Sequence, residues 1–368
     1  SSDTSLSYMG LPGRQCPFYK RIPDTPFAVD AFQYWNIPGV KMYFLSHFHS
    51  DHYIGLKKSF PFPIYCTQIT ANLVHMKLRV AEKFLRVLEL NKPEIICGVE
   101  VTALDANHCP GSVMFLFSLT NGRNYLHVGD FRASRAMTHQ PSLRSITITK
   151  LFLDTTYCNP QYCFPTQEEV IGRIVDIVRE HVQEHPRTLV VCGSYTIGKE
   201  KVFLGIAEAM NWRVWARPEK QRIFTCLDDS RINSRLVKDF RLANVHVLPM
   251  GSIQIRPLQQ HLQTCQGVFS HVIGVKPTGW ELNSASHSFK ATHKDNIKIY
   301  GVPYSEHSSF TELRDFVQFL QPHEVVPTVN VGNAAARTKM NKYFSDWLKS
   351  NGRNQSTEKQ MKVSQYFK

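Results

Sequence analysis

The chain of 368 residues is expected to fold as an α/β protein in which a strand-rich part is followed by a helix–strand part. Up to residue 165, short runs rich in β-branched and aromatic residues are separated by Gly, Pro and Asn, which is typical of strands joined by turns. From residue 166, apolar residues recur at helical spacing and alternate with short apolar runs. The length exceeds what one hydrophobic core usually fills, so one large or two intermediate domains are expected.

Composition narrows the class of protein. Hydrophobic residues make up 42% of the chain and charged residues 20%, as in ordinary globular proteins, and no apolar run approaches the roughly 18 residues of a membrane span. Nine cysteines without a Cys-x-x-Cys pair indicate reduced, mostly buried thiols of the cytosol or nucleus. The net charge of +13 suits a nucleic-acid partner, although charge also serves solubility. Because the chain starts with Ser, we expect a fragment of a longer protein.

The first part contains the strands that carry the candidate site. We expect a helix over residues 68–80 and strands over residues 40–46, 63–66, 112–119, 125–128 and 151–153. Each strand is bounded by turn-forming residues, and several end directly before a polar cluster. The ends of these strands are therefore where functional side chains are expected.

The second part begins at a capping box, Thr166-x-x-Glu169, which predicts the start of a helix. Ser309-x-x-Glu312 predicts another. The apolar stripes of these two helices are Val170, Ile171, Ile174, Val175, Val178 and Val182, and then Leu313, Phe316, Val317 and Leu320. We also expect strands over 188–192 and 325–331, helices over 199–210 and 334–348, and a polar, flexible segment over 351–359.

The run His47-Phe-His49-Ser-Asp51-His52 follows a predicted strand and combines three imidazoles with a carboxylate. Alternate positions let His47 and His49 converge on one ion, and Asp51 and His52 can serve a second. A lone His is usually structural, but this cluster after an apolar strand predicts a divalent-metal site. Further candidate ligands are His108 on a Gly/Pro turn, Asp130 and Asp154 at strand ends, and His307 before a capped helix. A purely structural role stays open, most of all for Asp154.

The series from His47 to His52, followed by His108 and Asp130, resembles the ligands of the metallo-β-lactamase superfamily. The resemblance implies an αββα sandwich with the site at one edge of its two sheets. It implies one ion on His47, His49 and His108, a second on Asp51, His52 and His307, and a bridging Asp130. Asp30 resembles the early aspartate that supports the ligand loop. Zinc fits the nitrogen-rich first site, and the second site suits zinc, manganese or magnesium.

The segment between Asp154 and His307 resembles the β-CASP insertion of nucleic-acid nucleases, with Asp154 and His307 matching two of its extra motifs. The implied domains are 1–158 and 303–350 (metallo-β-lactamase, two parts), 159–302 (inserted α/β β-CASP domain) and 351–368 (tail). At the third motif, RNA enzymes carry His and DNA enzymes Val; Val329 occupies that position here, and His323 precedes the strand. The likeness is greatest to the DNA cross-link repair exonucleases. It implies a nuclear, monomeric 5′-to-3′ exonuclease with catalytic roles for Asp30, Asp51, His52, Asp130 and Asp154.

The segment Gly193-Ser-Tyr-Thr-Ile-Gly198-Lys199 fits part of a phosphate-binding loop. Glu200 follows where a nucleotide-binding loop needs Ser or Thr for magnesium, so we do not expect an NTP site. Free backbone N–H groups, the hydroxyls of Ser194, Tyr195 and Thr196, the turn at Gly198 and the Lys199 ammonium group instead predict a site for a 5′-phosphate. A role of this loop in the fold alone remains an alternative.

The C-terminal run Gln360-Met-Lys-Val363-Ser-Gln-Tyr366-Phe367 resembles the peptide that docks on the replication sliding clamp. One helical turn would place Val363, Tyr366 and Phe367 on one face. A tail that folds back on the domain is the alternative for this segment.

Other functions remain open. A structure-selective DNA endonuclease would carry the same ligands, whereas an RNA endonuclease would carry His at position 329. A small-molecule hydrolase would lack the long insertion, and a catalytically dead DNA-binding scaffold would have lost ligands. The sequence therefore favours a DNA exonuclease that hydrolyses phosphodiesters with two divalent ions.

Overall fold

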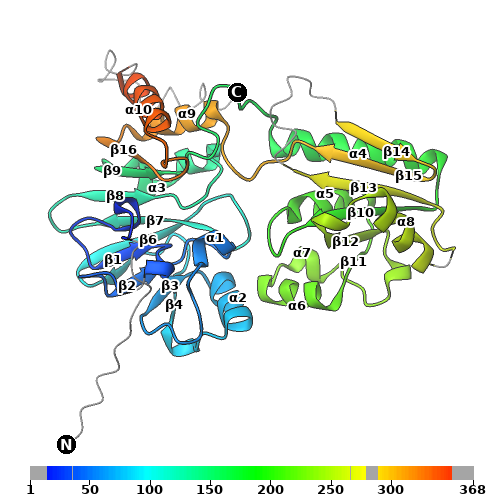
Figure 1. Ribbon diagram of the computed structural model, residues 1–368, viewed down its shortest axis with the longest axis horizontal. Helices are drawn as coiled ribbons and strands as arrows, with labels where there is room; N and C mark the ends of the chain where they lie inside the picture. The colour runs from blue at the N-terminus through cyan, green and yellow to red at the C-terminus, as the bar shows by residue number, and fades with distance from the viewer. Residues whose placement is uncertain (1–14, 35, 266, 279–288, 350–368) are drawn as a thin grey trace, which may run out of the picture.

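The computed structural model describes residues 15–34, 36–265, 267–278 and 289–349, which form two lobes (Figure 1). The predicted clamp-binding residues Gln360, Val363, Tyr366 and Phe367, and the predicted flexible segment 351–359, lie outside the described residues. One lobe is built on two sheets, and the other on a third sheet formed by residues from the middle of the chain.

Two sheets pack face to face in the first lobe. One contains the parallel strands β1 (Phe27–Val29), β2 (Met42–Phe44), β3 (Ile64–Cys66) and β4 (Leu85–Val87). The other has the order β16 (Glu324–Pro327), β9 (Lys150–Leu153), β8 (Asn124–His127), β7 (Val113–Ser118), β6 (Val99–Asp105) and β5 (Glu94–Ile96). Aromatic side chains of both sheets, among them Phe27, Phe44, Phe115 and Phe117, form the core between them.

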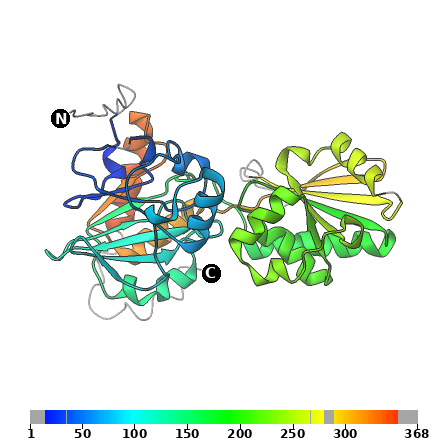
Figure 2. The ribbon, with the colours of Figure 1, turned by 90° about the horizontal axis from the view of Figure 1, so that it is seen from below.

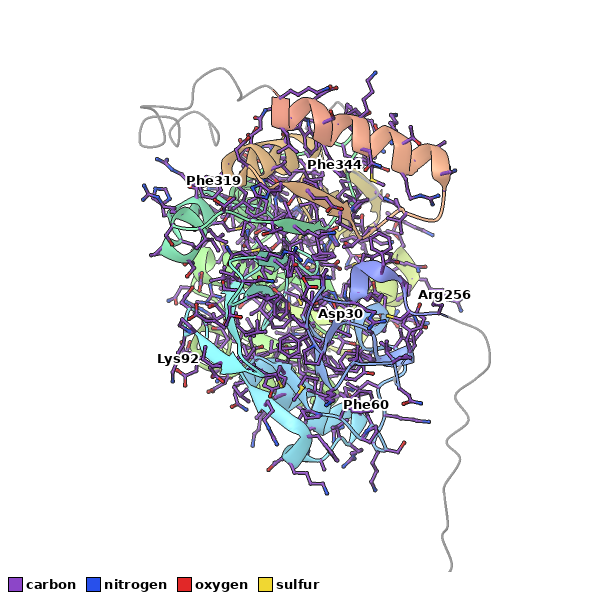
Figure 3. The ribbon with its side chains drawn as sticks, turned by 90° about the vertical axis from the view of Figure 1, so that its left-hand side faces the viewer. Asp30, Phe60, Lys92, Arg256, Phe319 and Phe344 are labelled. Atoms are coloured by element: carbon purple, nitrogen blue, oxygen red, sulfur yellow. The ribbon has the colours of Figure 1, made fainter. Side chains whose placement is uncertain are left out.

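Helices cover the two outer faces of this pair of sheets. α1 (Ser50–Tyr53) and α2 (Gln68–Leu78) lie over the first sheet, and α3 (Pro141–Arg144), α9 (Phe310–Leu320) and α10 (Ala334–Lys349) pack on the second. Figure 3 shows Phe344 beneath α10 at one end of the lobe, Phe60 toward the other end, and Asp30 between them. The layers are therefore helix, sheet, sheet, helix, and the predicted αββα sandwich is confirmed.

The inserted lobe is a doubly wound α/β unit. Its sheet has the order β11 (Val214–Ala216), β12 (Val245–Pro249), β10 (Thr188–Ser194), β13 (His271–Pro277), β15 (Ile297–Val302) and β14 (Lys290–Lys294), and β14 is the antiparallel strand. α4 (Gln167–Glu184) and α5 (Glu200–Met210) pack on one face, and α8 (Ile255–Thr264) on the other. α6 (Pro218–Leu227) and α7 (Ser230–Asn233) lie beside them. β10 is buried along its whole length, as expected of a central parallel strand.

The lobes are joined where the chain leaves after β9 and returns before α9 (Figure 2). β16 pairs in parallel with β9, so the sheet is completed by residues from both sides of the insertion. The lobes also touch between α2 and α6, where the Asn72 side-chain amide donates a 3.2 Å hydrogen bond to the carbonyl of Cys226.

The expected elements are present, and both capping boxes are formed, at Thr166 and Ser309. In the first lobe the sequence analysis missed β1, β4, β5 and β6, three of which are too short to show alternation, and the short helices α1 and α3. In the inserted lobe it missed β11 to β15 and α6 to α8. The strand expected over 325–331 ends at Pro327, because the Val329 N–H turns to the Thr155 hydroxyl instead of continuing the ladder.

Short 3-10 turns complete the described chain, at Phe18–Lys20, Phe32–Tyr34, Glu82–Phe84, Arg135–His139, Phe240–Leu242 and Met250–Ser252. All nine cysteines are free thiols, and Cys97 and Cys163 are exposed, so the expectation of burial fails for these two. Among the described residues, no helix has the length and apolar character needed to span a membrane.

Candidate metal centre

The ligand loop follows the carboxyl end of β2. His47 and His49 lie on the loop itself, with His49 at the N-cap of α1, and Asp51 and His52 lie within that single helical turn. Loops after β6 and β8 bring His108 and Asp130 to the same edge of the sandwich. The rigid sheets thus fix the bases of six side chains that come from three separate segments of the chain.

His47, His49, His108 and Asp130 form one group whose potential ligand atoms all lie within 4.8 Å of one another. The Nδ1 atom of His49 and the Nε2 atom of His108 are 3.2 Å apart, close enough to bind one ion together. The Nε2 atom of His47 is buried and has no hydrogen-bond partner. A buried imidazole nitrogen without a partner is costly, so this donor set fits a divalent cation.

Each of these three rings is held through its other nitrogen. The Nδ1 atom of His47 lies 2.9 Å from the Ser46 hydroxyl, whose own proton is donated to Asp30. His49 donates from Nε2 to the carbonyl of Ile197, and His108 from Nδ1 to the carbonyl of Glu306. Because these acceptors take the ring protons, the lone pairs of the remaining nitrogens face the centre of the group.

A second group contains Asp51, His52 and Asp130. The His52 Nε2 atom is 3.0 Å from Asp130 and 3.4 Å from Asp51, while its Nδ1 atom donates to Asp30 at 2.7 Å. Asp130 also belongs to the first group, so its carboxylate lies between two possible cation positions. The Asp51 side chain is 76% exposed, which leaves this side of the centre open to a ligand.

Asp30 supports the loop from beneath. It is buried in the left-handed backbone region, at φ 51°, and accepts hydrogen bonds from the Ser46 N–H and hydroxyl and from His52. Burial alone would raise the pKa of Asp30, but the neighbouring His52 charge and hydrogen bond lower it to about 2. Asp30 therefore connects Ser46 to His52 beneath the ligand loop.

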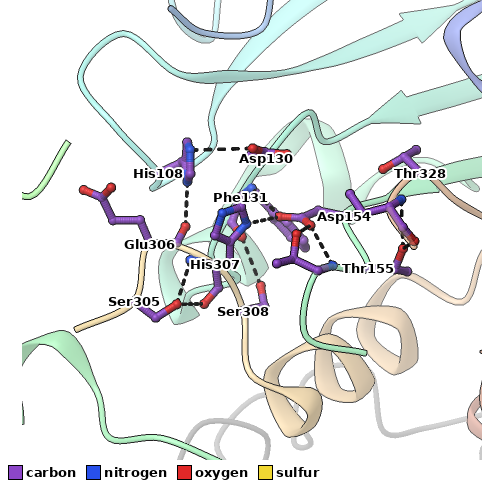
Figure 4. A network of polar contacts seen from close by, with 12 residues as sticks. His108, Asp130, Phe131, Asp154, Thr155, Ser305, Glu306, His307, Ser308 and Thr328 are labelled. Carbon is purple, nitrogen blue, oxygen red and sulfur yellow. Dashed lines mark hydrogen bonds and ion pairs between the residues drawn. The ribbon is translucent and has the colours of Figure 1, made fainter. Parts of the chain in front are cut away.

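His307 enters from the segment after the insertion and lies with Asp130 and Asp154 in a third group (Figure 4). Its Nδ1 atom donates to Asp154 at 2.7 Å. Asp154 also accepts from the Phe131 N–H and from the N–H and hydroxyl of Thr156. These contacts fit a residue that orients His307 more than one that meets substrate.

The electrostatics divide the five histidines into two sets. Burial, followed by neighbouring imidazoles, lowers the pKa of His47 and His108, and lowers that of His49 to about 3. Burial also acts against a charge on His52 and His307, but the adjacent carboxylates outweigh it and raise the pKa of both, to about 9 for His307. The first set is neutral and ready to bind a cation, whereas the second set holds protons that a cation would displace.

A pocket of about 610 Å³ opens at the centre. Asp51, His52, Asp130 and His307 line its floor, and Lys20 and the loop after β16 line its wall. Val329, the residue at the third motif position, also lines this pocket. A neighbouring pocket of about 420 Å³ shares Thr156, Asn330 and Gly332, so an extended ligand has a continuous path away from the metal ligands.

The Gly193–Lys199 loop meets this centre but differs from the expected anion site. The N–H of Gly198 is taken by Glu200, and that of Lys199 by Glu306 at 2.8 Å, so these two N–H groups are not free for a phosphate. Both glutamates are buried, so these N–H groups satisfy carboxylates that are shielded from water. Ser194 is buried and accepts from Lys220, whereas Tyr195 and Thr196 are exposed. The loop instead supplies the Ile197 carbonyl to His49.

Several contributors were missed from the sequence. Ser46 and Glu306 each stand directly before a ligand histidine, and that adjacency could have singled them out. The Ile197 carbonyl has no sequence signal because any residue supplies one. Lys220 comes from a separate helix and donates to the Ser194 hydroxyl and to the carbonyls of Tyr195 and Thr196.

Fold and ligand cluster together define a divalent-metal protein of the metallo-β-lactamase type. The family described as "DNA repair metallo-beta-lactamase" matches residues 230–333. The "DNA cross-link repair protein SNM1" of Arabidopsis thaliana is 46% identical over 91% of this chain and 70% of its own length. The chain belongs to this family of DNA repair metallo-β-lactamases, as the resemblance implied.

Other relatives agree with this placement. The "DNA cross-link repair 1A protein" of Gallus gallus is 48% identical over 94% of this chain. The match covers 36% of that protein, so this chain spans about a third of its length. The "5' exonuclease Apollo" of Gallus gallus is 35% identical over 84% of this chain and 63% of its own length. A solved Enterococcus faecalis V583 protein of unknown function shares the fold, with a TM-score of 0.50 at 14% identity over 78% of this chain and 74% of that one.

Proposed function

We propose that the chain is a divalent-metal-dependent DNA nuclease that removes nucleotides from 5′-phosphorylated ends, with a role in interstrand cross-link repair in the nucleus. The observation that carries the proposal is the set of imidazoles whose protons are taken by fixed acceptors so that their free nitrogens converge beside Asp130. The names of the relatives, which include DNA cross-link repair proteins and a 5′ exonuclease, support the substrate and direction.

In this proposal His47, His49 and His108 would hold a zinc ion, and Asp51, His52 and His307 would hold a second ion, zinc, manganese or magnesium, with Asp130 available to both. Such ions lower the pKa of a bound water to about 7 and neutralise charge on phosphate oxygens. Asp30 and Asp154 fix the rings of His52 and His307 through 2.7 Å hydrogen bonds. No side chain needs to act as a covalent nucleophile.

The remaining residues of the site are assigned to the substrate. Lys20 lines the pocket and is anchored through the Asp30 carbonyl, which places a positive charge beside the path of a phosphate backbone. We assign the 5′-phosphate to the 194–199 loop, through the exposed Tyr195 and Thr196 and through Lys199, whose backbone N–H donates to the carboxylate of Glu306 directly before His307. Ser194 and Gly198 shape this loop.

The rest of the proposal concerns organisation. We divide the chain into a metallo-β-lactamase domain at 1–158 and 303–350 and an inserted β-CASP domain at 159–302. The segment with Gln360, Val363, Tyr366 and Phe367 is proposed to bind the sliding clamp, and the enzyme is proposed to act as a monomer without a membrane partner.

The decisive experiment is a digest of DNA labelled at its 3′ end, with either a 5′-phosphate or a 5′-hydroxyl, in the presence of zinc, manganese or magnesium. A ladder that shortens from the 5′ end, faster on the phosphorylated strand and absent with a chelator, is the expected result. Discrete internal fragments would point instead to an endonuclease, preferred cleavage of RNA to an RNA enzyme, and binding without cleavage to a scaffold. Any of these would overturn the exonuclease proposal.

A further inference from the structure

A second cluster of metal-ligand side chains lies in the inserted lobe. His246, His261 and Cys265 each offer one ligand atom, and the three atoms lie within 4.8 Å of one another. His246 comes from β12, and His261 and Cys265 from α8 and the residue that ends it. Figure 1 places α8 on the side of the inserted lobe away from the sandwich, so this cluster is separate from the catalytic centre.

The local structure presents the three atoms to one point. His261 and Cys265 are four residues apart, which puts their side chains on the same face of a helix. His246 donates from Nε2 to the carbonyl of Phe240 at 2.7 Å, and this leaves its Nδ1 atom with a free lone pair. That Nδ1 atom is 2.8 Å from the Nε2 atom of His261. A backbone carbonyl that fixes one nitrogen of a histidine is the usual support of a metal ligand.

The surroundings of the cluster favour uncharged imidazoles in an apolar environment. His246 and Cys265 are fully buried, and the rings of Trp215, Phe240 and Phe269 surround His246. Burial lowers the pKa of His246 to about 4, and burial followed by the Arg217 charge lowers that of His261, so both imidazoles are unprotonated at neutral pH. His261 is only partly buried, which gives an ion and a fourth, water ligand access from one side.

We propose that His246, His261 and Cys265 form a structural zinc site that ties α8 to β12. Two imidazoles and one thiolate form a ligand set that binds zinc in preference to magnesium or calcium. Binding of a zinc ion would release the Cys265 proton. In the absence of the ion, the His261 Nε2–H group donates to the His246 Nδ1 atom and fills the same position. The site goes beyond the proposed nuclease function and does not depend on it.

Cobalt substitution tests this site, because a thiolate ligand gives a charge-transfer band in the near ultraviolet. The full chain is stripped with a chelator and titrated with Co²⁺ alone. The parent is expected to develop the band, and Cys265→Ser to lose it together with one equivalent of tightly bound zinc. His261→Gln, a change at a partly exposed helical position that preserves folding, is expected to lose the band as well. Cys163→Ser, at an exposed thiol, is the matched control and keeps it.

The following outcomes would overturn the proposed zinc site. A parent without the band, or a band that survives in folded Cys265→Ser and His261→Gln, means that the cluster is a hydrogen-bonded histidine pair and no metal site. A band lost only in Cys109→Ser places the thiolate at the catalytic centre, beside His108, and also overturns the proposal. Cleavage of DNA is not a readout, so failure of the nuclease proposal leaves this test intact.

Discussion

The histidines of the centre differ in how their rings are held, and this decides what each contributes. Backbone carbonyls hold His49 and His108, which stay neutral, whereas carboxylates hold His52 and His307, which keep protons until a cation arrives. Asp130 belongs to ligand groups that contain histidines of both kinds. Histidines that look alike in the sequence therefore occupy two different electrostatic environments in the fold.

Asp51→Ala is expected to abolish cleavage and to remove one equivalent of bound metal while the protein stays folded, because the Asp51 side chain is largely exposed and supports no core. The measurements are metal content, digestion of 5′-phosphorylated DNA and thermal unfolding. Asp346→Ala, at an exposed carboxylate of α10, is the control and should match the parent. Substantial activity in purified Asp51→Ala would contradict the proposed role of this residue.

The affinity for metal is expected to fall as the pH falls below about 9. Below its pKa of about 9 the His307 ring is protonated without metal, so a cation must displace that proton, at a cost of about tenfold in affinity per pH unit for each proton displaced. Competition with a fluorescent chelator between neutral and alkaline pH measures the slope. In Asp154→Asn the raised pKa is lost, so the slope should be shallower; an affinity independent of pH in the parent would refute the prediction.

The ends of the strands and helices determine where the metal-ligand residues lie. The ligands lie in loops after strands, in the short helix α1 that follows β2, or before a helix, so the caps and turns matter more than the interiors of the strands. α4 and α9 both start with a complete capping box, and α9 follows His307 within three residues.

Thr166→Ala is expected to lower the free energy of unfolding by about 1 kcal/mol, because the hydroxyl that accepts from the Glu169 N–H is lost at the start of α4. Chemical denaturation followed by circular dichroism gives the change. Thr338→Ala, inside α10, removes a hydroxyl that caps nothing and should leave stability unchanged or slightly higher. Equal losses of unfolding free energy in both variants would show that the capping hydroxyl contributes no more to stability than a hydroxyl inside a helix.

Lys199→Ala is expected to slow digestion of 5′-phosphorylated DNA and to raise KM, with a smaller deficit on 5′-hydroxyl DNA, where less charge is to be bound. The ratio of kcat/KM for the two substrates is the readout. Lys238→Ala, an exposed lysine of the inserted lobe, is the control and should keep the parental ratio. If Lys199→Ala also keeps that ratio, the loop serves the fold and another surface reads the end.

The two lobes depend on each other at the metal centre. The inserted lobe supplies the Ile197 carbonyl to His49, and the sandwich supplies the Glu306 carboxylate to the Lys199 N–H. The insertion is therefore expected to help shape the ligands as well as to extend the surface for nucleic acid.

Gly198→Ala tests this dependence. Gly198 has φ +105°, and an added Cβ would lie 2.8 Å from the Glu306 carboxylate, so the loop should shift and His49 should lose its acceptor. Loss of such a supporting contact typically lowers metal affinity roughly 10–100-fold. Gly172→Ala in α4 has open space around it and should keep parental affinity while gaining about 0.5–1 kcal/mol of stability. Unchanged metal affinity in folded Gly198→Ala would mean that the lobes act independently.

The sequence by itself determined the capped helices and the ligand types, because these follow from local spacing: His47 to His52 after an apolar strand, and Thr166 and Ser309 three residues before a glutamate. The αββα sandwich was implied by the resemblance of the ligand series to a known superfamily and not by that spacing. Only the tertiary structure decided which nitrogen of each ring is free, how the histidines divide between neutral and charged, and that Glu200 and Glu306 occupy the N–H groups once expected to bind phosphate. Several of these outcomes depend on partners more than a hundred residues away, such as Ile197 at His49, Glu306 at Lys199 and Asp154 at His307, and pairings of that kind leave no periodic trace in the chain.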